Sequence, residues 1–270
     1  MTQPGVAERG TALVTGASSG IGLALARELA AHGHSLVLVA RDRVKLTATA
    51  DELHGKYGVA AHAVAKDLSV PGAVEDLWSI VADEVPIVDI LVNNAGIGAY
   101  GEFVEQPLDV VTRMQMTNVL AVTTLTRLVL PGMLERKRGR ILNVASVVGY
   151  QPGGPRMAVY YATKSYVLSF SKGLARELDG SGVSVTALSP GVTSSSFEDR
   201  SGARDTRLYR LVPQASAEAV ARAGYRAMMR GNRVAIPGLM TKLLSIAGEL
   251  PPRSIALAIN GWLLRRPHAH

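Results

Sequence analysis

The chain reads Thr15-Gly16-Ala17-Ser18-Ser19-Gly20-Ile21-Gly22 between its first apolar run and its first helical segment. The run 12–14 is typical of a buried strand, and the apolar residues of 23–32 recur at helical spacing. A glycine-rich turn between a strand and a helix is a setting that binds phosphate, because the first N–H groups of the helix and the positive end of its dipole face the turn. Alone the pattern is a weak signal, since a tight turn without a ligand has the same composition.

Each glycine of this turn has its own expected role. Gly16 permits the tight turn, Gly20 lets the backbone approach a pyrophosphate, and Gly22 lets the helix pack close to the sheet. The expected contacts of the phosphates are Gly16, Ser18, Ser19, Gly20, Ile21 and Gly22. The turn therefore predicts a dinucleotide site, which the other motifs have to support.

Strand-like and helix-like segments alternate along the rest of the chain. The strand-like segments are 11–14, 35–40, 60–65, 87–92, 140–145, 183–188 and 233–236. The helix-like segments are 23–32, 44–57, 72–85, 108–134, 159–178 and 217–229. The strands are apolar runs and not strict alternations, which is typical of a parallel sheet covered by helices on both faces. We therefore predict an α/β fold, with one doubly wound parallel sheet in a domain over 1–237 and a helical extension over 238–270.

Composition limits the class of protein. The 270 residues include no cysteine, which excludes disulfides and thiolate sites. Residues 1–11 do not resemble a secretory signal, and no stretch of about 18 apolar residues lacks charge or proline, so we expect a cytoplasmic protein without a spanning helix. Residues 199–270 hold twelve Lys or Arg against four Asp or Glu, a net charge of +8 in a chain of net charge +7. This basic part could be a solvated surface, or could bind an anionic substrate or membrane; without a nucleic-acid motif, nucleic acid ranks last.

Residues after the predicted strands are candidates for the dinucleotide site, because such sheets bind ligands beyond the carboxyl ends of their strands. Arg41 follows the second strand directly, where an arginine neutralises the 2′-phosphate of NADP and an acid binds the free 2′-hydroxyl of NAD. Arg41 favours NADP(H), whereas its neighbour Asp42 keeps NAD(H) open as the less favoured cofactor. The third strand ends in Asp67-Leu68, where the carboxylate can accept from an adenine amino group, and the fourth in Asn93-Asn94-Ala95-Gly96. The plainer interpretations are a solvated arginine and an ordinary Asn/Gly turn.

Four polar residues are candidates for proton transfer. Ser146 follows the fifth strand, fourteen positions before Tyr160, and Lys164 lies four positions after Tyr160 on the same predicted helix face. A cation about 4 Å from the phenol would stabilise the phenolate by roughly 4 kcal/mol at an effective dielectric near 20, or about three pKa units, enough to make a tyrosine a working base. Isolated Tyr-x-x-x-Lys pairs are nevertheless common by chance. Asn118, inside the apolar segment 108–134, needs buried partners: a backbone group, or a water behind Lys164.

As a set, these motifs resemble the short-chain dehydrogenase/reductase family over roughly residues 8–237. The set consists of the glycine turn, Asn93-Asn94-Ala95-Gly96, Asn118, Ser146, Tyr160-x-x-x-Lys164 and Pro190-Gly191-Val192-Thr193. The resemblance implies a Rossmann-type domain with a catalytic tetrad. Asn118 would anchor a relay water, Ser146 would bind the substrate oxygen and Tyr160 would be the general acid/base. Lys164 would lower the tyrosine pKa and hold the nicotinamide ribose, and Pro190, Gly191, Val192 and Thr193 would lie beside the nicotinamide.

The resemblance also implies an activity. It predicts an oxidoreductase that moves hydride between NADP(H), or less favourably NAD(H), and a small-molecule carbonyl or secondary alcohol, without a metal. It implies a homodimer or homotetramer packed through the helices that contain Asn118 and Tyr160. The rival hypotheses are a non-catalytic dinucleotide sensor and a membrane-surface lipid-binding protein. The gap between Ser146 and Tyr160 is longer than is common, which predicts a remodelled substrate mouth. Tyr161 has Ser165, not a cation, four positions on, so we expect it to pack in the core.

Two further segments are expected to shape the substrate site. Residues 194–214 predict a mobile, partly apolar lid for a lipophilic substrate, and its four arginines raise the hypothesis of an anionic group on that substrate; the alternative is a solvated loop. The four arginines of this segment are Arg200, Arg204, Arg207 and Arg210. Beyond them, 239–250 and 254–264 read as two short apolar helices separated by Pro251-Pro252. These helices could pack on the domain, roof the pocket, form a subunit interface or lie on a membrane.

Overall fold

The computed structural model describes residues 10–85, 87–194 and 197–266. Residues 1–9, where we expect no secretory signal, lie outside this range, as do residues 195–196 of the expected lid and 267–270 of the extension.

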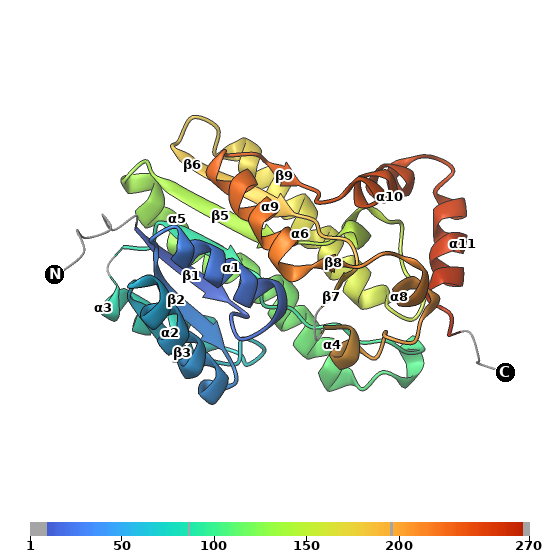
Figure 1. Cartoon of the computed structure of the whole chain (residues 1–270). Helices are drawn as coiled ribbons and strands as arrows, with labels where there is room; N and C mark the ends of the chain where they lie inside the picture. Colours follow the sequence, from blue (N-terminus) through green and yellow to red (C-terminus); the bar gives the residue numbers. More distant parts are fainter. Residues whose placement is uncertain (1–9, 86, 195–196, 267–270) are drawn as a thin grey trace.

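Seven parallel strands form one sheet in the order β3-β2-β1-β4-β5-β6-β9, as Figure 1 shows. Their bounds are β1 Thr11–Thr15, β2 Ser35–Ala40, β3 Ala61–Ala65, β4 Ile90–Asn93, β5 Gly139–Val144, β6 Val183–Leu188 and β9 Val234–Ala235. The chain winds outward from β1 to β3 and then returns to β4 on the other side of β1. The winding therefore reverses between β1 and β4, and the predicted doubly wound sheet is confirmed.

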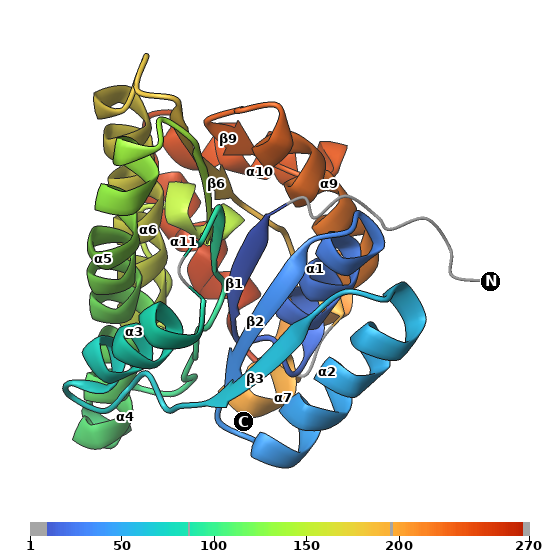
Figure 2. The ribbon, with the colours of Figure 1, turned by 90° about the vertical axis from the view of Figure 1, so that its left-hand side faces the viewer.

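Helices cover both faces of the sheet, as Figure 2 shows end-on. One face carries α1 (Gly20–Ala31), α2 (Arg43–Tyr57) and α9 (Ala217–Met229), and the other carries α3 (Ala73–Glu84), α5 (Ala121–Glu135) and α6 (Ala158–Glu177). Successive strand residues point to opposite faces, so that every residue of a central strand meets a core. In β1, Ala12 and Val14 pack with α1 and Leu13 packs with α3 and α5. This double burial explains why the strands read as unbroken apolar runs.

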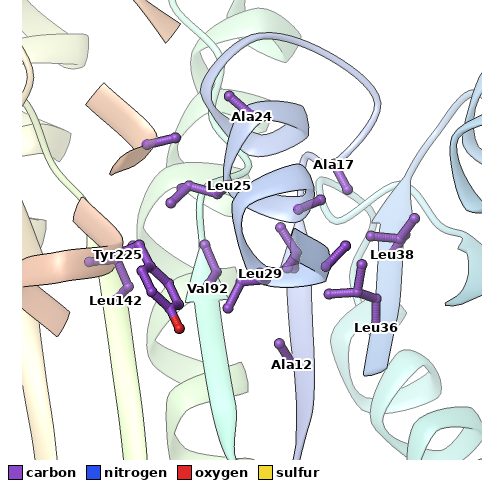
Figure 3. Packing of buried hydrophobic residues seen from close by; sticks show 14 of the residues in the cluster. Ala12, Ala17, Ala24, Leu25, Leu29, Leu36, Leu38, Val92, Leu142 and Tyr225 are labelled. Atoms are coloured by element: carbon purple, nitrogen blue, oxygen red, sulfur yellow. The ribbon is translucent and has the colours of Figure 1, made fainter. Parts of the chain in front are cut away.

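Figure 3 shows the core on the α1 side of the sheet. Leu25 and Leu29 of α1 lie over the sheet between Leu36 and Leu38 of β2 and Tyr225 of α9, and all five are buried. This packing fixes α1 against the sheet, and with it the glycine turn that precedes α1.

The segment 108–134 is not the single regular helix that its periodicity predicts. It consists of α4 (Leu108–Gln115), a π-helical turn (Met116–Leu120) and α5. A π turn inserts an extra residue into a helix, often at a functional site, and leaves no mark on the spacing of apolar residues. Asn118 lies in the middle of this turn.

By length and composition alone, one helical stretch of the described residues could cross a membrane. Leu108–Glu135 has a mean hydropathy of 1.2 over its most apolar window. Core helices pass the same test, and Met114, Leu125, Val129 and Met133 of this stretch are fully or almost fully buried in the domain.

The bounds of several elements differ from prediction, most of them by one residue. β4 begins at Ile90, three residues late, although the Asp89 N–H already donates to the Thr11 carbonyl at 2.9 Å. β9 is the edge strand and pairs over only two residues, Val234 and Ala235. α1 begins at Gly20, three residues early, because the glycine turn leads directly into the helix.

The part of the chain after β6 returns to the sheet with α9 and β9 and places α8 (Arg207–Leu211), α10 (Leu239–Glu249) and α11 (Arg253–Leu263) at one end of the molecule (Figure 1). Its other elements are β7 (Thr193–Ser194), α7 (Phe197–Ser201) and β8 (Ala215–Ser216). The loop that makes the Ser146-to-Tyr160 gap long holds the last two helices. The Gln151 side chain donates to the Leu244 carbonyl of α10, and the Asn260 side chain of α11 donates to the Gly153 carbonyl, each at 2.8 Å.

Candidate active site

A cavity of about 880 Å³ opens beyond the carboxyl ends of the strands, where the winding reverses. Its walls include most of the residues that the sequence predicts: Gly16, Ser18, Ser19, Gly20, Ile21, Arg41, Asp67, Leu68, Asn94, Ala95, Gly96, Ser146, Tyr160, Lys164, Pro190, Gly191, Val192 and Thr193. Two predicted site residues, Gly22 and Asn118, are not among the lining residues and lie behind the wall.

The glycine turn is tied to the end of β4. The Asn94 side chain donates to the Thr15 carbonyl at 2.9 Å and to the Gly16 carbonyl at 3.3 Å. Gly16 has φ +67°, and a Cβ added there would lie 2.7 Å from the Asn94 amide nitrogen. A Cβ on Gly22 would collide with both the Gly16 carbonyl and this amide. Gly22 therefore serves the packing of the turn, as predicted, from behind the cavity.

The first turn of α1 presents its backbone to the cavity. Ser19 is the N-cap residue, but its side chain makes no capping hydrogen bond to the helix. The leading N–H groups of α1 can then bind an anion, which the helix dipole also favours. The Arg200 guanidinium, from α7, donates to the Ser19 hydroxyl at 3.4 Å. Sequence reasoning placed Arg200 in the lid and missed that it reaches the glycine turn.

The corner after β2 places two cations and one acid at the cavity wall, and the acid also caps a helix. Asp42 is the N-cap of α2, where it accepts from the Lys45 backbone N–H at 3.1 Å and pairs with the Lys45 ammonium at 3.3 Å. The hydrogen bond from the Lys45 backbone holds the pKa of Asp42 below its usual value. Both Arg41 and Lys45 line the cavity. Sequence reasoning missed Lys45, although an aspartate just before a helical segment is a recognisable capping signal.

The corner after β3 holds an ionised carboxylate. Asp67 accepts from the Ser69 hydroxyl at 2.7 Å and from the Ser69 N–H at 3.0 Å, and Arg113 lies 3.7 Å away. Burial alone would raise the pKa of Asp67, but the Ser69 hydrogen bonds and the charges of Arg41 and Arg113 bring it below its usual value. The carboxylate is thus available as a hydrogen-bond acceptor at the cavity wall. Arg113 comes from α4, and no sequence signal linked it to the site.

Ser146, Tyr160 and Lys164 meet on one wall of the cavity. Ser146 lies two residues after the end of β5 and accepts from the Val148 N–H at 3.3 Å, which fixes the start of a short 3-10 helix, Val147–Tyr150. Tyr160 and Lys164 come from the first turns of α6. The buried Lys164 ammonium donates to the Val144 carbonyl at 2.8 Å and lies 5.9 Å from the centre of the Tyr160 ring. The predicted shared helix face therefore brings the phenol and the cation together beside the serine.

The predicted lowering of the tyrosine pKa by the lysine is wrong in this structure. Burial raises the pKa of Tyr160, and a hydrogen bond with Ser146 opposes this only in part. Burial also lowers the pKa of Lys164 to about 8. Removal from water disfavours both the phenolate and the ammonium, and burial is the largest cause of both pKa shifts. At neutral pH Tyr160 is consequently a protonated phenol, which can act as an acid.

Asn118 is buried and bonds to protein groups on both sides. Its oxygen accepts from the Ile97 N–H at 2.9 Å, and its nitrogen donates to the Ile97 carbonyl at 2.9 Å and to the Thr163 hydroxyl at 3.0 Å. Of the two partners that the sequence allowed, the structure shows the backbone group. Because Thr163 precedes Lys164 on α6, Asn118 braces the loop after β4 against the helix that carries the phenol and the cation.

The outer part of the cavity is apolar. Phe197 of α7 packs against Tyr160 with ring centres 5.2 Å apart. Around it lie side chains from α6, α8 and α10: Tyr161, Leu208, Tyr209, Met240, Thr241 and Leu244. Tyr161 is buried in the adjacent core cluster, in line with its predicted packing role. Of the alternatives for the helical extension, α10 thus roofs the pocket, which the sequence left open.

The lid arginines point to protein groups more than to the cavity. Arg204 pairs with Asp199 at 2.8 Å, and the Arg207 guanidinium lies 4.8 Å from the centre of the Trp262 ring. Arg200 is the one of the four that the cavity walls include. The hypothesis of an anionic substrate held by several lid arginines therefore loses its structural support.

A buried amide network beneath the site was also missed. The Asn93 side chain, at the end of β4, donates to the Thr126 hydroxyl at 3.0 Å and to the side-chain oxygen Oδ1 of Asn143 at 2.9 Å, and the Asn143 side chain, in β5, donates to the Ser171 hydroxyl at 2.9 Å. The signal for it is an asparagine inside an apolar strand, because such an amide needs buried partners. The network locks β4 and β5 to α5 and α6 below the catalytic wall.

Comparison with known protein families gives a match to the short chain dehydrogenase model over residues 10–205. A short chain dehydrogenase of Pseudocercospora fijiensis is 41% identical over 72% of this chain and 62% of its own length. The very-long-chain 3-oxoacyl-CoA reductase of Anas platyrhynchos is 40% identical over 66% of this chain and 58% of its own length. The ketoacyl reductase HetN of Nostoc is 33% identical over 91% of this chain and 86% of its own length. The chain thus spans about three fifths of the length of the first two of these relatives.

Solved structures agree with the sequence matches. A short-chain dehydrogenase from Sphingobium yanoikuyae in complex with NADPH superposes with a TM-score of 0.79 at 36% identity, covering 88% of this chain and 92% of its own. The bulky-bulky ketone specific alcohol dehydrogenase from Comamonas testosteroni gives 0.75 at 32% identity, covering 88% and 91%. A family member from Burkholderia phymatum in complex with NAD gives 0.77 at 26% identity, covering 88% and 92%. The chain therefore belongs to the short-chain dehydrogenase family of NAD(P)-dependent oxidoreductases.

Proposed function

We propose that this chain is an NADP(H)-dependent reductase of lipophilic ketones, with Tyr160 as the proton donor. The observation that carries the proposal is the meeting of Ser146, Tyr160 and Lys164 on one wall of the cavity, between a phosphate-binding turn and an apolar roof. The carbonyl would lie against the two hydroxyls, and the reduced nicotinamide would supply hydride to its carbon.

The residues of the cavity fit a dinucleotide. Gly16, at φ +67°, and the uncapped start of α1 form a cradle that suits a pyrophosphate. The Asp67 carboxylate can accept from an adenine amino group, and Lys164 can reach a ribose hydroxyl from the catalytic wall. Pro190 to Thr193, after β6, would border the nicotinamide on the other side.

The proton chemistry follows from the burial of the site. Because burial keeps Tyr160 protonated, its hydroxyl can donate a proton to the carbonyl oxygen as negative charge develops there. Ser146 can donate a second hydrogen bond to the same oxygen. The phenolate that remains lies on the helix face of Lys164, whose pKa of about 8 leaves most of it charged at neutral pH. A cation beside a newly formed anion in a water-poor site stabilises that anion strongly. Asn118 acts on this wall through Ile97 and Thr163; a relay water at Asn118 stays a prediction.

The preference for NADP(H) rests on the corner after β2. Arg41, Asp42 and Lys45 all line the cavity, and Asp42 is engaged in capping α2 and in pairing with Lys45. Two cations suit a 2′-phosphate, and an acid that is already engaged is a poor acceptor for a ribose 2′-hydroxyl. The complex of the Sphingobium yanoikuyae enzyme with NADPH supports this preference by analogy, and the Burkholderia phymatum complex with NAD shows that neighbours in the family differ.

The lipophilic substrate rests on the roof of the cavity. Phe197, Tyr209, Met240 and Leu244 leave a mainly apolar space above Tyr160. Names among the relatives, a reductase of very-long-chain 3-oxoacyl-CoA and an enzyme for bulky ketones, are consistent with a large apolar substrate. We propose a ketone with bulky apolar substituents and no requirement for an anionic group.

We further propose that the protein is a homodimer or homotetramer packed through the helices that contain Asn118 and Tyr160. Leu120 and Leu134 on the α4–α5 side and Tyr166 on α6 are exposed apolar side chains of one protomer. Light scattering after size-exclusion chromatography tests this, and a Leu120→Glu/Tyr166→Glu variant that stays as associated as the wild type would refute the interface.

A substrate screen tests the proposed activity. Purified protein is incubated with NADPH or NADH and a panel of ketones that runs from acetone to bulky aryl and long-chain ketones, and cofactor oxidation is matched to alcohol formed. We expect NADPH-dependent reduction of the bulky apolar members. No turnover with any ketone or corresponding alcohol, despite NADPH binding, would favour the non-catalytic sensor.

A further inference from the structure

α10 and α11 carry apolar residues on their solvent side. On α10, Leu239, Leu243, Ile246 and the adjoining Leu250 recur at a spacing of three to four residues, and between 53% and 75% of each is exposed. On α11, Ile255, Ile259 and Trp262 form a second exposed stripe at the same spacing. We call these seven residues the C-terminal apolar face.

The buried residues of the same helices are polar or small. Ser245 and Gly248 of α10 and Asn260 of α11 are the buried residues of these helices. Asn260 bonds to Gly153 at 2.8 Å, and a Cβ on Gly248 would lie 2.7 Å from the Tyr150 carbonyl. A helix that packs on a globular domain in water normally buries its apolar stripe and exposes its polar one. Both helices reverse this rule, so the apolar face has a partner other than its own domain.

The charges around the C-terminal apolar face are mostly positive. Residues 239–266 contain four basic residues, Lys242, Arg253, Arg265 and Arg266, and one acidic residue, Glu249. Glu249 lies 3.8 Å from Lys172 of α6, so even this acid is beside a cation. A second copy of the chain docked on this face would bring like charges together, whereas a surface of negative charge would complement them.

We propose that the C-terminal apolar face docks on an anionic lipid bilayer, with α10 and α11 lying in the interface. Each helix has eleven residues, too few to span a hydrocarbon core and suited to lying in its plane. An exposed tryptophan, here Trp262, is a side chain that bilayer interfaces favour. Figure 1 places both helices at the end of the molecule away from α2 and α3, so the rest of the domain would project from the lipid.

The cavity lies directly behind this face. Met240 is both exposed and part of the cavity wall, and Thr241 and Leu244 line the cavity from the inner side of α10. When α10 is docked on lipid, this one helix would therefore be all that lies between the bilayer and the interior of the pocket. The docking itself does not depend on the proposed activity, because it is measured without substrate or cofactor.

Vesicle flotation tests the proposal on the full-length protein. The vesicles contain phosphatidylcholine with about one-third phosphatidylserine, or phosphatidylcholine alone. We expect the wild type to float with the anionic vesicles, and Leu243→Glu/Ile246→Glu to weaken binding about tenfold or more because it charges the centre of the face. Lys242→Gln/Arg253→Gln should weaken binding by roughly tenfold on anionic vesicles only. The control pair, Ile80→Glu/Ile87→Glu, charges exposed isoleucines elsewhere and should bind as the wild type does.

A second readout does not depend on how well the charged variants fold. The chain has two tryptophans, so a Trp78→Phe variant reports Trp262 alone, and its emission should shift to the blue when anionic vesicles are added. Each of three results would overturn the proposal. The wild type could stay in the unbound fraction, the Trp262 emission could stay unshifted, or the Leu243→Glu/Ile246→Glu variant could bind as well as the wild type. If the wild type ignores vesicles and this variant pair dissociates an oligomer, a second copy covers the face instead.

Discussion

The proposed preference for NADPH predicts that replacing Arg41 by alanine leaves an enzyme that hardly distinguishes the two cofactors. Arg41 and Lys45 both line the cavity at the corner after β2, and both side chains are exposed. A unit charge pair at about 4 Å is worth roughly 1 kcal/mol in water and about 4 kcal/mol near a protein surface of effective dielectric 20. Because the corner is open to solvent, we take the lower half of this range, about 1 to 2 kcal/mol per cation.

This magnitude predicts a fall in kcat/KM for NADPH of roughly 5- to 30-fold in Arg41→Ala, carried mainly by KM. NADH should lose less than about twofold, because its ribose has no 2′-phosphate to contact the guanidinium. The assay measures initial rates with one ketone at saturating concentration while each cofactor is varied. The Arg41→Ala/Lys45→Ala double variant should lose more, but less than the product of the single losses, because both cations contact one phosphate.

Asp42→Asn provides the matched control for this experiment. Asparagine retains the ability to cap α2, so the helix should be preserved while the negative charge is removed. If Asp42 only caps the helix, NADH kinetics should be unchanged. A loss of NADH efficiency in Asp42→Asn, or equal losses of both cofactors in Arg41→Ala, would refute the assignment of this corner to a 2′-phosphate.

Four further perturbations test other parts of the site. Ketone reduction should decline as pH rises through about 8 in the free enzyme, because deprotonated Lys164 no longer stabilises the phenolate; a kcat/KM profile that is flat to pH 10 would contradict this. Asn118→Leu removes the hydrogen-bond partner of the partly buried N–H and carbonyl of Ile97, at about 1 kcal/mol each, and urea denaturation should show this loss, whereas unchanged stability would refute the bracing role. Asn143→Leu should destabilise the fold by a similar amount, since Asn93 loses one of its two acceptors; unchanged denaturation would mean that the Asn93–Asn143 hydrogen bond contributes nothing. Phe197→Ala should raise KM for bulky ketones several-fold and leave NADPH affinity intact, and equal effects on small and bulky ketones would remove Phe197 from the substrate wall.

The sheet and the glycine turn could be predicted from the sequence because their causes are local. Strands buried on both faces must be apolar throughout, and a backbone that folds back on itself at Gly16 and Gly22 must use glycine. The spacing of Tyr160 and Lys164 places both on one face of α6 whatever surrounds them. Positions that follow each strand converge because all the strands are parallel.

The features that were missed depend on tertiary structure. Arg113 and Arg200 reach the cavity from α4 and α7, and no local pattern points there. The π turn at Asn118 changes the helix by one residue without disturbing its apolar spacing. The pKa of Tyr160 moves opposite to the prediction because the spacing of a pair gives its attraction but not the burial that both groups share. Periodicity likewise revealed the stripes of α10 and α11 but not that they face outward.

The most direct test of the central claim is a comparison of wild type with Tyr160→Phe in NADPH-dependent reduction of one bulky ketone. The substitution removes only the hydroxyl, so NADPH binding, measured by the quenching of protein fluorescence, should be retained. We predict a fall in kcat of about 10²- to 10⁴-fold, the usual contribution of a positioned proton donor. Turnover by Tyr160→Phe at the wild-type rate would contradict the assignment of the phenol as the acid.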